Sequence, residues 1–168
     1  MVLAGWLLVN CLMWLRPDFA QAFRQGFSID LPGMLLVLAV VVISILTHEL
    51  VHGLFFWLFA GRIPEFGVGM GYAFAAMPDW FYPKCQYLTV ALSPLLLLTC
   101  LGVLVSAFVP MAWLGFLLIG MTFNAGGAIG DIYVCWRIAR EPEHIWVKDT
   151  GDGFQVYRYP VILPGETF

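Results

Sequence analysis

The sequence predicts an all-α membrane protein with three to four transmembrane helices, a membrane-associated β-hairpin and a small cytoplasmic hairpin near the C-terminus. Two observations predict this class. Hydrophobic residues make up 61% of the 168 residues and charged residues 11%, whereas soluble domains have about 45–50% and about 25%. In addition, three apolar stretches, 33–60, 86–109 and 111–136, are each long enough to cross the hydrocarbon core as a helix.

Charge and cysteine usage narrow the function classes. The formal net charge is −3 and there is no basic tract, so the sequence offers no support for nucleic-acid binding. The partner that the composition does predict is the lipid bilayer. The four cysteines show no C-x-x-C spacing and predict no disulfide framework.

Residues 1–32 form the first predicted segment. Residues 1–15 are apolar, but they are fewer than the ~20 residues that a transmembrane helix needs. A tilted interfacial helix and a short span both fit, and we favour a short membrane-embedded helix. Residues 16–32 disperse their charges among polar residues and are typical of a connector.

The predicted core, residues 33–136, begins with a helix over 33–60. The only ionisable residues in this helix are His48, Glu49 and His52. Burying one such group at the centre of a membrane helix costs roughly 2.5–3.5 kcal/mol, so these residues are candidates for function. The alternative is that they hold neighbouring helices together through hydrogen bonds.

The spacing H-E-x-x-H carries a specific chemistry. Residues i and i+4 share one face of a helix, so His48 and His52 can bind one metal ion. Glu49 lies about 100° further round the helix and can act as a general base without being a ligand. This is the arrangement of a zincin, with two histidine ligands and a glutamate base.

The next two segments connect this helix to the rest of the core. Between Phe66 and Phe74, bulky residues alternate with Gly or Ala, and this period of two predicts a strand or a hairpin after the H-E-x-x-H helix. The hairpin is either a structured connector or an open strand edge that pairs with an extended substrate beside the metal. The helix over 86–109 contains Pro94, which frees a carbonyl and tends to kink the helix.

The helix over 111–136 contains one charged residue, Asp131. Asn124 lies seven residues earlier, two turns away on the same face of this helix. Asp131 is therefore placed to supply a third ligand to a metal held by His48 and His52. The alternative is a hydrogen bond from Asp131 to a neighbouring helix or to Tyr133.

The tail, residues 137–168, is polar and predicts a small hairpin around 149–153. If each of the three long helices crosses the membrane once, the basic residues on one side are Arg62, Lys84, Arg137, Arg140 and Lys148. Those on the other side are Arg16 and Arg24. The excess predicts that the first side is cytoplasmic in a multi-pass membrane protein.

These residues resemble the site-2-protease type of intramembrane zinc metallopeptidase, and more closely a bacterial zincin-peptidase family of small membrane proteins. His48-Glu49-x-x-His52-Gly53 resembles the first motif of the family. The glycine-rich stretch 67–72 resembles its membrane-associated β segment, and Ala91-Leu92-Ser93-Pro94 loosely resembles an Ala-Gly-Pro element. Residues 123–131 resemble an Asn…Asp-Gly motif, although Ile132 replaces the glycine and the intervening prolines are absent.

The resemblance implies a zinc metalloendopeptidase that cleaves transmembrane or membrane-proximal protein substrates in the bacterial cytoplasmic membrane. It implies Zn²⁺ held by His48, His52 and Asp131, with Glu49 as the base. Asn124 is then a second catalytic candidate that donates a hydrogen bond to the substrate or to the developing oxyanion; the alternative is helix packing.

Two other functions remain open on the sequence alone. One is a non-catalytic metal-binding membrane protein, such as a carrier or sensor. The helix over 86–109 offers no polar path across the bilayer, which counts against transport. The other is a pseudoprotease scaffold without turnover, against which the intact H-E-x-x-H motif argues.

Overall fold

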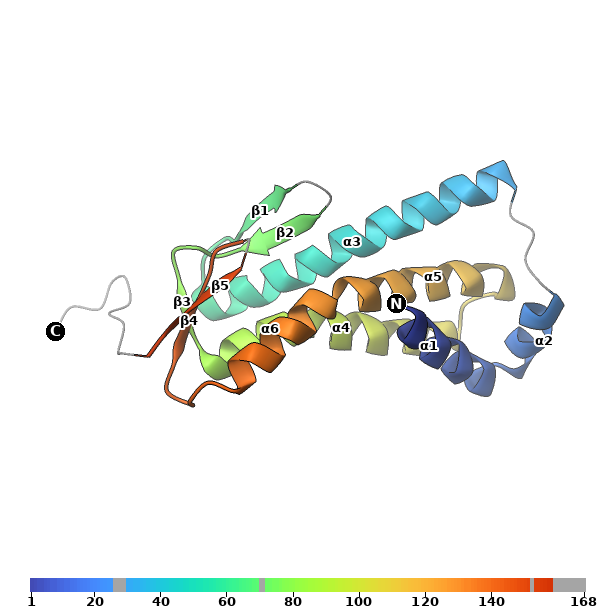
Figure 1. The fold of residues 1–168 in the computed structure, drawn as a ribbon. Coiled ribbons are helices and arrows are strands. Elements are labelled where there is room, and N and C mark those ends of the chain that lie inside the picture. The colour runs from blue at the N-terminus through green and yellow to red at the C-terminus, as the bar shows by residue number, and fades with distance from the viewer. Residues whose placement is uncertain (26–29, 70–71, 152, 159–168) are drawn as a thin grey trace. The chain divides into compact units, whose positions relative to one another are not determined.

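The structure is a computed structural model that describes residues 1–25, 30–69, 72–151 and 153–158. The chain divides into two compact units, whose helices and strands are labelled in Figure 1. Unit 1 comprises Met1–His48 and Leu95–Ala128, and unit 2 comprises Glu49–Pro94 and Ile129–Phe168. Two helices, α3 (Leu31–Ala60) and α4 (Lys84–Ser106), each run without interruption through a part of both units.

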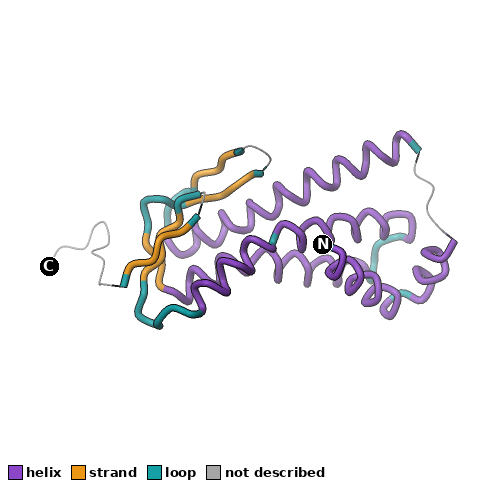
Figure 2. Tube along the Cα trace, viewed as in Figure 1, coloured by secondary structure: helices purple, strands orange, loops and turns teal. Residues whose placement is uncertain are grey.

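The described part of unit 1 is helical (Figure 2), and it contains α1 (Val2–Leu15), α2 (Pro17–Gln25) and α5 (Met111–Gly127) besides its parts of α3 and α4. A small core joins α1, α2 and α5 through the buried side chains of Leu12, Phe19 and Leu114. The Arg16 guanidinium donates to the carbonyls of Ser106 and Val109 at 3.1 Å each, so it satisfies main-chain groups where α4 ends.

Helix α2 lies within the segment that the sequence analysis treated as a connector. Its sequence contains ordinary helix signals. Pro17 occupies the first position, Asp18 the first turn and Arg24 the last turn, which complements the helix dipole at both ends. Phe19 turns into the core of unit 1 and is fully buried. The connector therefore has a helix of its own, stabilised by one anchoring side chain.

Unit 2 contains both sheets (Figure 2). Strands β1 (Glu65–Val68) and β2 (Ala73–Ala76) pair antiparallel, which confirms the hairpin predicted between Phe66 and Phe74; its residues 70–71 lie outside the described residues. The second sheet has the order β3-β4-β5, from Phe81–Pro83, Trp146–Asp149 and Phe154–Tyr157. Strands β4 and β5 confirm the predicted C-terminal hairpin, whose residue 152 is not described. Strand β3 was not predicted, because a stretch of three residues that ends in proline is too short to show the alternation of side chains typical of a strand.

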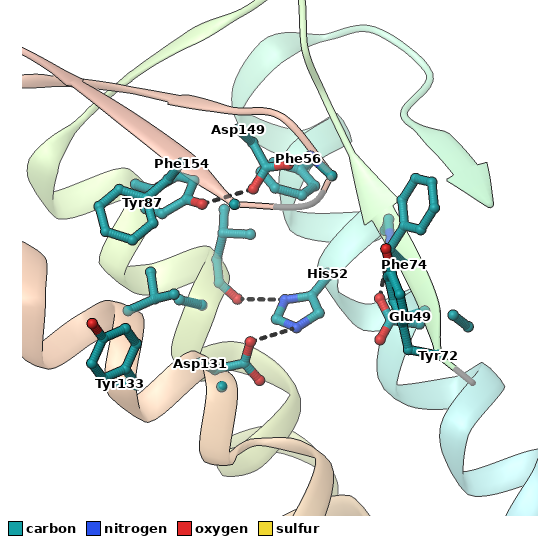
Figure 3. A pocket seen from close by; sticks show the side chains of 18 residues that line it. Glu49, His52, Phe56, Tyr72, Phe74, Tyr87, Asp131, Tyr133, Asp149 and Phe154 are labelled. Atoms are coloured by element: carbon teal, nitrogen blue, oxygen red, sulfur yellow. Dashed lines mark hydrogen bonds and ion pairs between the residues drawn. The ribbon is translucent and has the colours of Figure 1, made fainter. Parts of the chain in front are cut away.

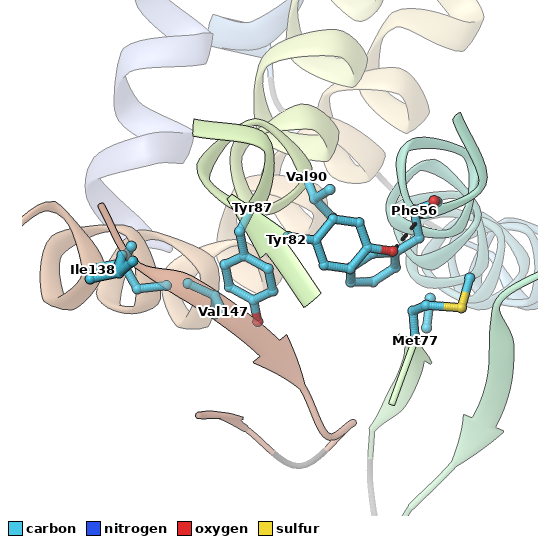
Figure 4. Packing of buried hydrophobic residues seen from close by; sticks show 9 residues of the cluster. Phe56, Met77, Tyr82, Tyr87, Val90, Ile138 and Val147 are labelled. Carbon is cyan, nitrogen blue, oxygen red and sulfur yellow. Dashed lines mark hydrogen bonds between the residues drawn. The ribbon is translucent and has the colours of Figure 1, made fainter. Parts of the chain in front are cut away.

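The core of unit 2 is aromatic (Figure 4). Phe56 of α3, Tyr82 of β3 and Tyr87 of α4 pack with ring centroids 5.3 to 6.5 Å apart. Ile138 of α6 (Ile129–Ala139) and Val147 of β4 belong to the same buried cluster. This cluster joins both sheets to the three helical segments of unit 2 and so fixes the surroundings of the residues on α3, α4 and α6.

The prediction of one continuous helix over 111–136 is wrong. Helix α5 ends at Gly127 and α6 begins at Ile129, with Ala128 as a turn residue between them. Two consecutive glycines, Gly126 and Gly127, weaken a helix at this point because each has a low helix propensity. Asp131 therefore lies in the first turn of a new helix. The argument that Asn124 and Asp131 share a face of one helix does not hold.

Among the residues that the structure describes, three helical stretches are long and apolar enough to cross a membrane: Leu31–Ala60, Lys84–Ser106 and Met111–Ala139. They correspond to the three spans predicted from the sequence. Helix α3 is about 45 Å long at the usual rise of ~1.5 Å per residue. Its large apolar side chains are exposed, for example Leu38 and Ile43 at 61% each. Such a surface is stable in lipid rather than in water. Helix α1 has 14 residues and is shorter than a full span.

Candidate metal centre

His48 and His52 lie one turn apart on the uninterrupted helix α3, as their spacing predicts. Both are buried, with 5% and 8% of their surface exposed. A buried imidazole needs hydrogen-bond partners or a metal, because an unsatisfied polar group is costly in an apolar surrounding. The hydrogen-bond partners of each ring therefore show which of its nitrogens can bind a metal.

The His48 ring is oriented by α5 within unit 1. Its Nδ1 lies 2.9 Å from Oδ1 of Asn124, a side chain that is itself buried. Because an amide oxygen only accepts, Nδ1 carries the proton and Nε2 keeps its lone pair. Gly127 lies alongside the ring, and a β-carbon there would be 3.9 Å from Cε1. His48 is thus held as the tautomer that can ligate a metal through Nε2.

The His52 ring is oriented by α4 within unit 2. Its Nδ1 lies 3.0 Å from the main-chain oxygen of Val90, so this nitrogen also carries the proton. Its Nε2 faces Asp131 of α6, with 3.3 Å between Nε2 and Oδ1 (Figure 3). An imidazole nitrogen and a carboxylate oxygen thus face each other, and a neutral imidazole with a carboxylate is a pair of ligands that can bind a divalent cation such as zinc.

Glu49 is positioned by the β-hairpin. Its Oε2 accepts a hydrogen bond from the main-chain N–H of Ala75 in β2 at 2.9 Å. The hairpin in turn fits closely against α3 at Gly53, where a β-carbon would lie only 2.4 Å from the ring of Phe66. The glycine after the H-E-x-x-H motif thus lets β1 approach α3 and brings β2 to the glutamate.

A pocket of about 460 Å³ in unit 2 contains this chemistry (Figure 3). Glu49, His52 and Asp131 line it together with aromatic and small side chains. It also contains a carboxylate that sequence reasoning did not select. Asp149 of β4 accepts hydrogen bonds from the Tyr87 hydroxyl at 2.7 Å and from the Gly151 amide at 2.8 Å. The Asp149-Thr-Gly turn sequence could have indicated the second bond, since aspartate commonly binds the amide two residues on.

Burial raises the pKa of Asp149 above its ordinary value. The hydrogen bonds from Tyr87 and Gly151 and the nearby His52 act in the opposite direction and favour the ionised form. Burial is the largest of these effects. Asp149 is therefore a carboxylate whose charge is disfavoured in the folded protein, and it lies in the same pocket as Glu49 and Asp131.

A family model described as "Putative zincin peptidase" matches residues 41–146, which is more than half of the chain. The chain belongs to this zincin peptidase family. The match includes every residue selected above for chemistry, from His48 to Asp131. No curated protein and no solved structure matches the chain.

Zincin membership implies a zinc ion, and the donor set of this zincin-family chain fits one. Within unit 2, Nε2 of His52 and Oδ1 of Asp131 lie 3.3 Å apart, and His48 lies one turn before His52 on the same helix α3. Two neutral imidazoles and one carboxylate form a ligand set that zinc peptidases use, with bonds of about 2.0–2.2 Å. Nδ1 of each ring lies within hydrogen-bond distance of an oxygen, so Nε2 is the nitrogen that would bind the metal.

The residues selected from the sequence are distributed over both units of this zincin-family chain. His52, Asp131 and Glu49 lie in unit 2, and His52 faces Asp131 directly. His48 and Asn124 lie in unit 1 and bind each other. The sequence did not reveal that the Val90 carbonyl orients His52 or that the Ala75 amide orients Glu49, although Pro94 had indicated a freed carbonyl in α4.

Proposed function

We propose that this zincin-family chain is an intramembrane zinc metalloprotease that hydrolyses peptide bonds of membrane-protein substrates within or at the edge of the bilayer. One observation carries the proposal: Nε2 of His52 lies 3.3 Å from the Asp131 carboxylate while its Nδ1 is bound to a main-chain oxygen. Family membership supports a metallopeptidase. The three apolar helices, one of which carries the motif, support action in a membrane.

His48, His52 and Asp131 would hold the zinc ion, with Nε2 as the ligand atom of both histidines. Zinc bound there would act as a Lewis acid that polarises a carbonyl and makes water more acidic. Placing three ionisable groups among apolar helices is expensive, and a shared cation offsets that cost. These three side chains together make up a three-residue ligand set.

Glu49 would act as the general base. Its carboxylate takes a proton from the attacking water as the new C–O bond forms at the scissile carbonyl carbon. It then gives the proton to the leaving nitrogen as the C–N bond breaks. The hydrogen bond from the Ala75 amide limits rotation of the side chain and so would hold the carboxylate in place for both proton transfers.

Asn124 has a defined part in this proposal. Its Oδ1 accepts from His48 and so orients a zinc ligand. Its amide nitrogen is the group that would donate to the substrate backbone or to the developing oxyanion. The two roles use different atoms of one side chain and are compatible with each other.

An extended substrate would pair with the outer edge of β2. In an antiparallel hairpin, alternate residues turn both main-chain groups toward the partner strand. The Gly69 amide donates to the Tyr72 carbonyl, and the Ala75 amide donates to Glu49 rather than to β1. Ala73 and Ala75 therefore direct their main-chain groups away from β1. A substrate strand added there would run beside Glu49.

Localisation in the bacterial cytoplasmic membrane, with the hairpins on the cytoplasmic side, belongs to the same proposal. Unit 2 contains both sheets and the basic residues Arg62, Lys84 and Lys148. Positively charged segments next to membrane helices remain on the cytoplasmic side. Water and substrate would then reach Glu49 from the cytoplasm.

The experiment is a comparison of Glu49→Gln with wild type on purified full-length protein in lipid nanodiscs. We expect Glu49→Gln to lose cleavage of transmembrane peptides while it keeps one bound zinc per chain, because the amide cannot take a proton and Glu49 is not a ligand. Glu65→Gln, an exposed residue of β1, serves as the control. Full proteolysis by Glu49→Gln would remove the mechanism. If the wild type binds zinc but does not cleave, a pseudoprotease scaffold is favoured. If it moves zinc across the membrane, a carrier is favoured.

A further inference from the structure

Pro94 lies inside helix α4 and changes the hydrogen bonding of one particular carbonyl. In a regular helix the N–H of residue 94 would donate to the carbonyl of residue 90. Proline has no N–H, and its ring pushes that carbonyl away from the helix axis. The Val90 carbonyl therefore lacks its ordinary partner. Such a group must find another donor where the surroundings are apolar.

Two side chains supply that donor. The Ser93 hydroxyl donates to the Val90 oxygen at 2.8 Å, and Nδ1 of His52 donates to the same oxygen at 3.0 Å. Val90 and Ser93 are both buried, with 2% and 6% of their surface exposed. A carbonyl oxygen has two lone pairs, so these two donors use its full capacity.

We propose that Pro94 is a positioning residue for the zinc ligand His52, because the N–H that it lacks keeps the Val90 carbonyl available to hold the imidazole. This inference rests on the proposed function, in which Nε2 of His52 binds zinc. The Val90 carbonyl fixes the tautomer and the direction of the ring. Nε2 is thereby left facing Asp131 at 3.3 Å (Figure 3).

An ordinary residue at position 94 would add a third donor to an oxygen that accepts two. One of the present donors would have to withdraw, and the helix N–H would have the advantage of regular geometry. Loss of the His52 bond would free the ring to rotate and would allow its proton to move from Nδ1 to Nε2. Changes of this kind around a zinc ligand typically weaken metal binding about 10–100-fold.

The competing explanation is that Pro94 only bends α4. The two explanations differ in what replacement does to stability and to metal binding. Restoring the N–H removes a helix-breaking residue, so the metal-free protein should unfold at a higher temperature. A positioning role predicts that zinc affinity falls in the same variant. Stability and affinity then change in opposite directions.

The experiment uses full-length Pro94→Ala in detergent micelles, with zinc affinity measured by competition against a chromophoric chelator. We expect binding about 10–100-fold weaker than that of wild type. The visible absorption spectrum of the Co²⁺-substituted protein should also change, because one imidazole is no longer held. Ser93→Ala alone removes one of the two donors to Val90 and should keep the affinity of wild type.

The double variant Ser93→Ala, Pro94→Ala provides the rescue. Removing the serine hydroxyl leaves one lone pair for the new main-chain N–H at position 94 and one for His52, so zinc affinity should return toward that of wild type. Unchanged affinity in Pro94→Ala would overturn the inference, as would a double variant as weak as the single one. Either result leaves the proposed function standing, provided that wild type binds zinc. A wild-type protein that binds no zinc would overturn both.

Discussion

The two nitrogens of His52 have separate tasks. Nδ1 donates to the main chain of α4, and Nε2 faces Asp131 of α6. His48 repeats this division, with Asn124 as the acceptor for its Nδ1. A neutral ring held in this way keeps a lone pair at Nε2, which a metal ligand requires. The tautomers of both histidines thus follow from their acceptors rather than from the metal.

At the same scale, Asp149 should make folding stability depend on pH. Burial raises its pKa above the ordinary value of 3.8, so the folded protein retains a proton that the unfolded chain has already released. Stability is therefore lost as pH rises from about 4 through the pKa of the folded protein. Asp149→Asn should flatten this part of the profile, measured as the unfolding temperature at successive pH values. The exposed Asp79→Asn should keep the slope of wild type, and an equal slope in Asp149→Asn would contradict the assignment.

Among the helices and strands, α3 and the β1–β2 hairpin were predicted correctly from local sequence patterns. The i, i+4 spacing on α3 and the period of two in the β1–β2 segment are local patterns, and the structure has both elements where they were expected. The break at Ala128 was missed, because the apolar character continues through Gly126 and Gly127 and hides their low helix propensity. Strand β3 was missed because it exists only through pairing with β4, which lies far along the chain.

Lys84, the first residue of α4, joins this helix to the end of α6. Its ammonium group donates to the carbonyls of Ala139 and Glu141 at 3.2 and 2.8 Å, and to the Glu143 carboxylate at 3.1 Å. These bonds satisfy main-chain groups at and beyond the C-terminus of α6, where a positive charge is also favoured by the helix dipole. The side chain is 8% exposed, so little water can replace them.

Lys84→Met keeps the apolar stem of this side chain and removes the three donors. We expect unfolding stability to fall by about 1–3 kcal/mol, because three part-buried hydrogen bonds from a charged donor are lost. The matched control is Arg137→Met, which removes an exposed positive charge from the last turn of the same helix α6. Denaturant unfolding in detergent measures both. Equal stability of the two variants would show that the Lys84 bonds contribute nothing.

At the scale of the whole molecule, composition was the strongest predictor. An apolar fraction of 61% and three long apolar stretches predicted the three helices that are long enough to cross a membrane. The exposed leucines and isoleucines of α3 are what such a helix presents to lipid. The candidate ligands were found because ionisable residues are rare in these helices. The groups that orient these ligands were not recognised from the sequence, although Pro94 had indicated a freed carbonyl in α4.

X-ray absorption at the zinc edge directly tests the proposal that His48, His52 and Asp131 bind one zinc ion. On purified full-length protein we predict one zinc per chain, with two imidazole nitrogens and the remaining neighbours oxygen. Asp131→Ala should release the metal or remove one of the oxygen neighbours. A protein without zinc, a sulfur neighbour such as Cys135 could supply one turn after Asp131, or an identical spectrum in Asp131→Ala would contradict the claim.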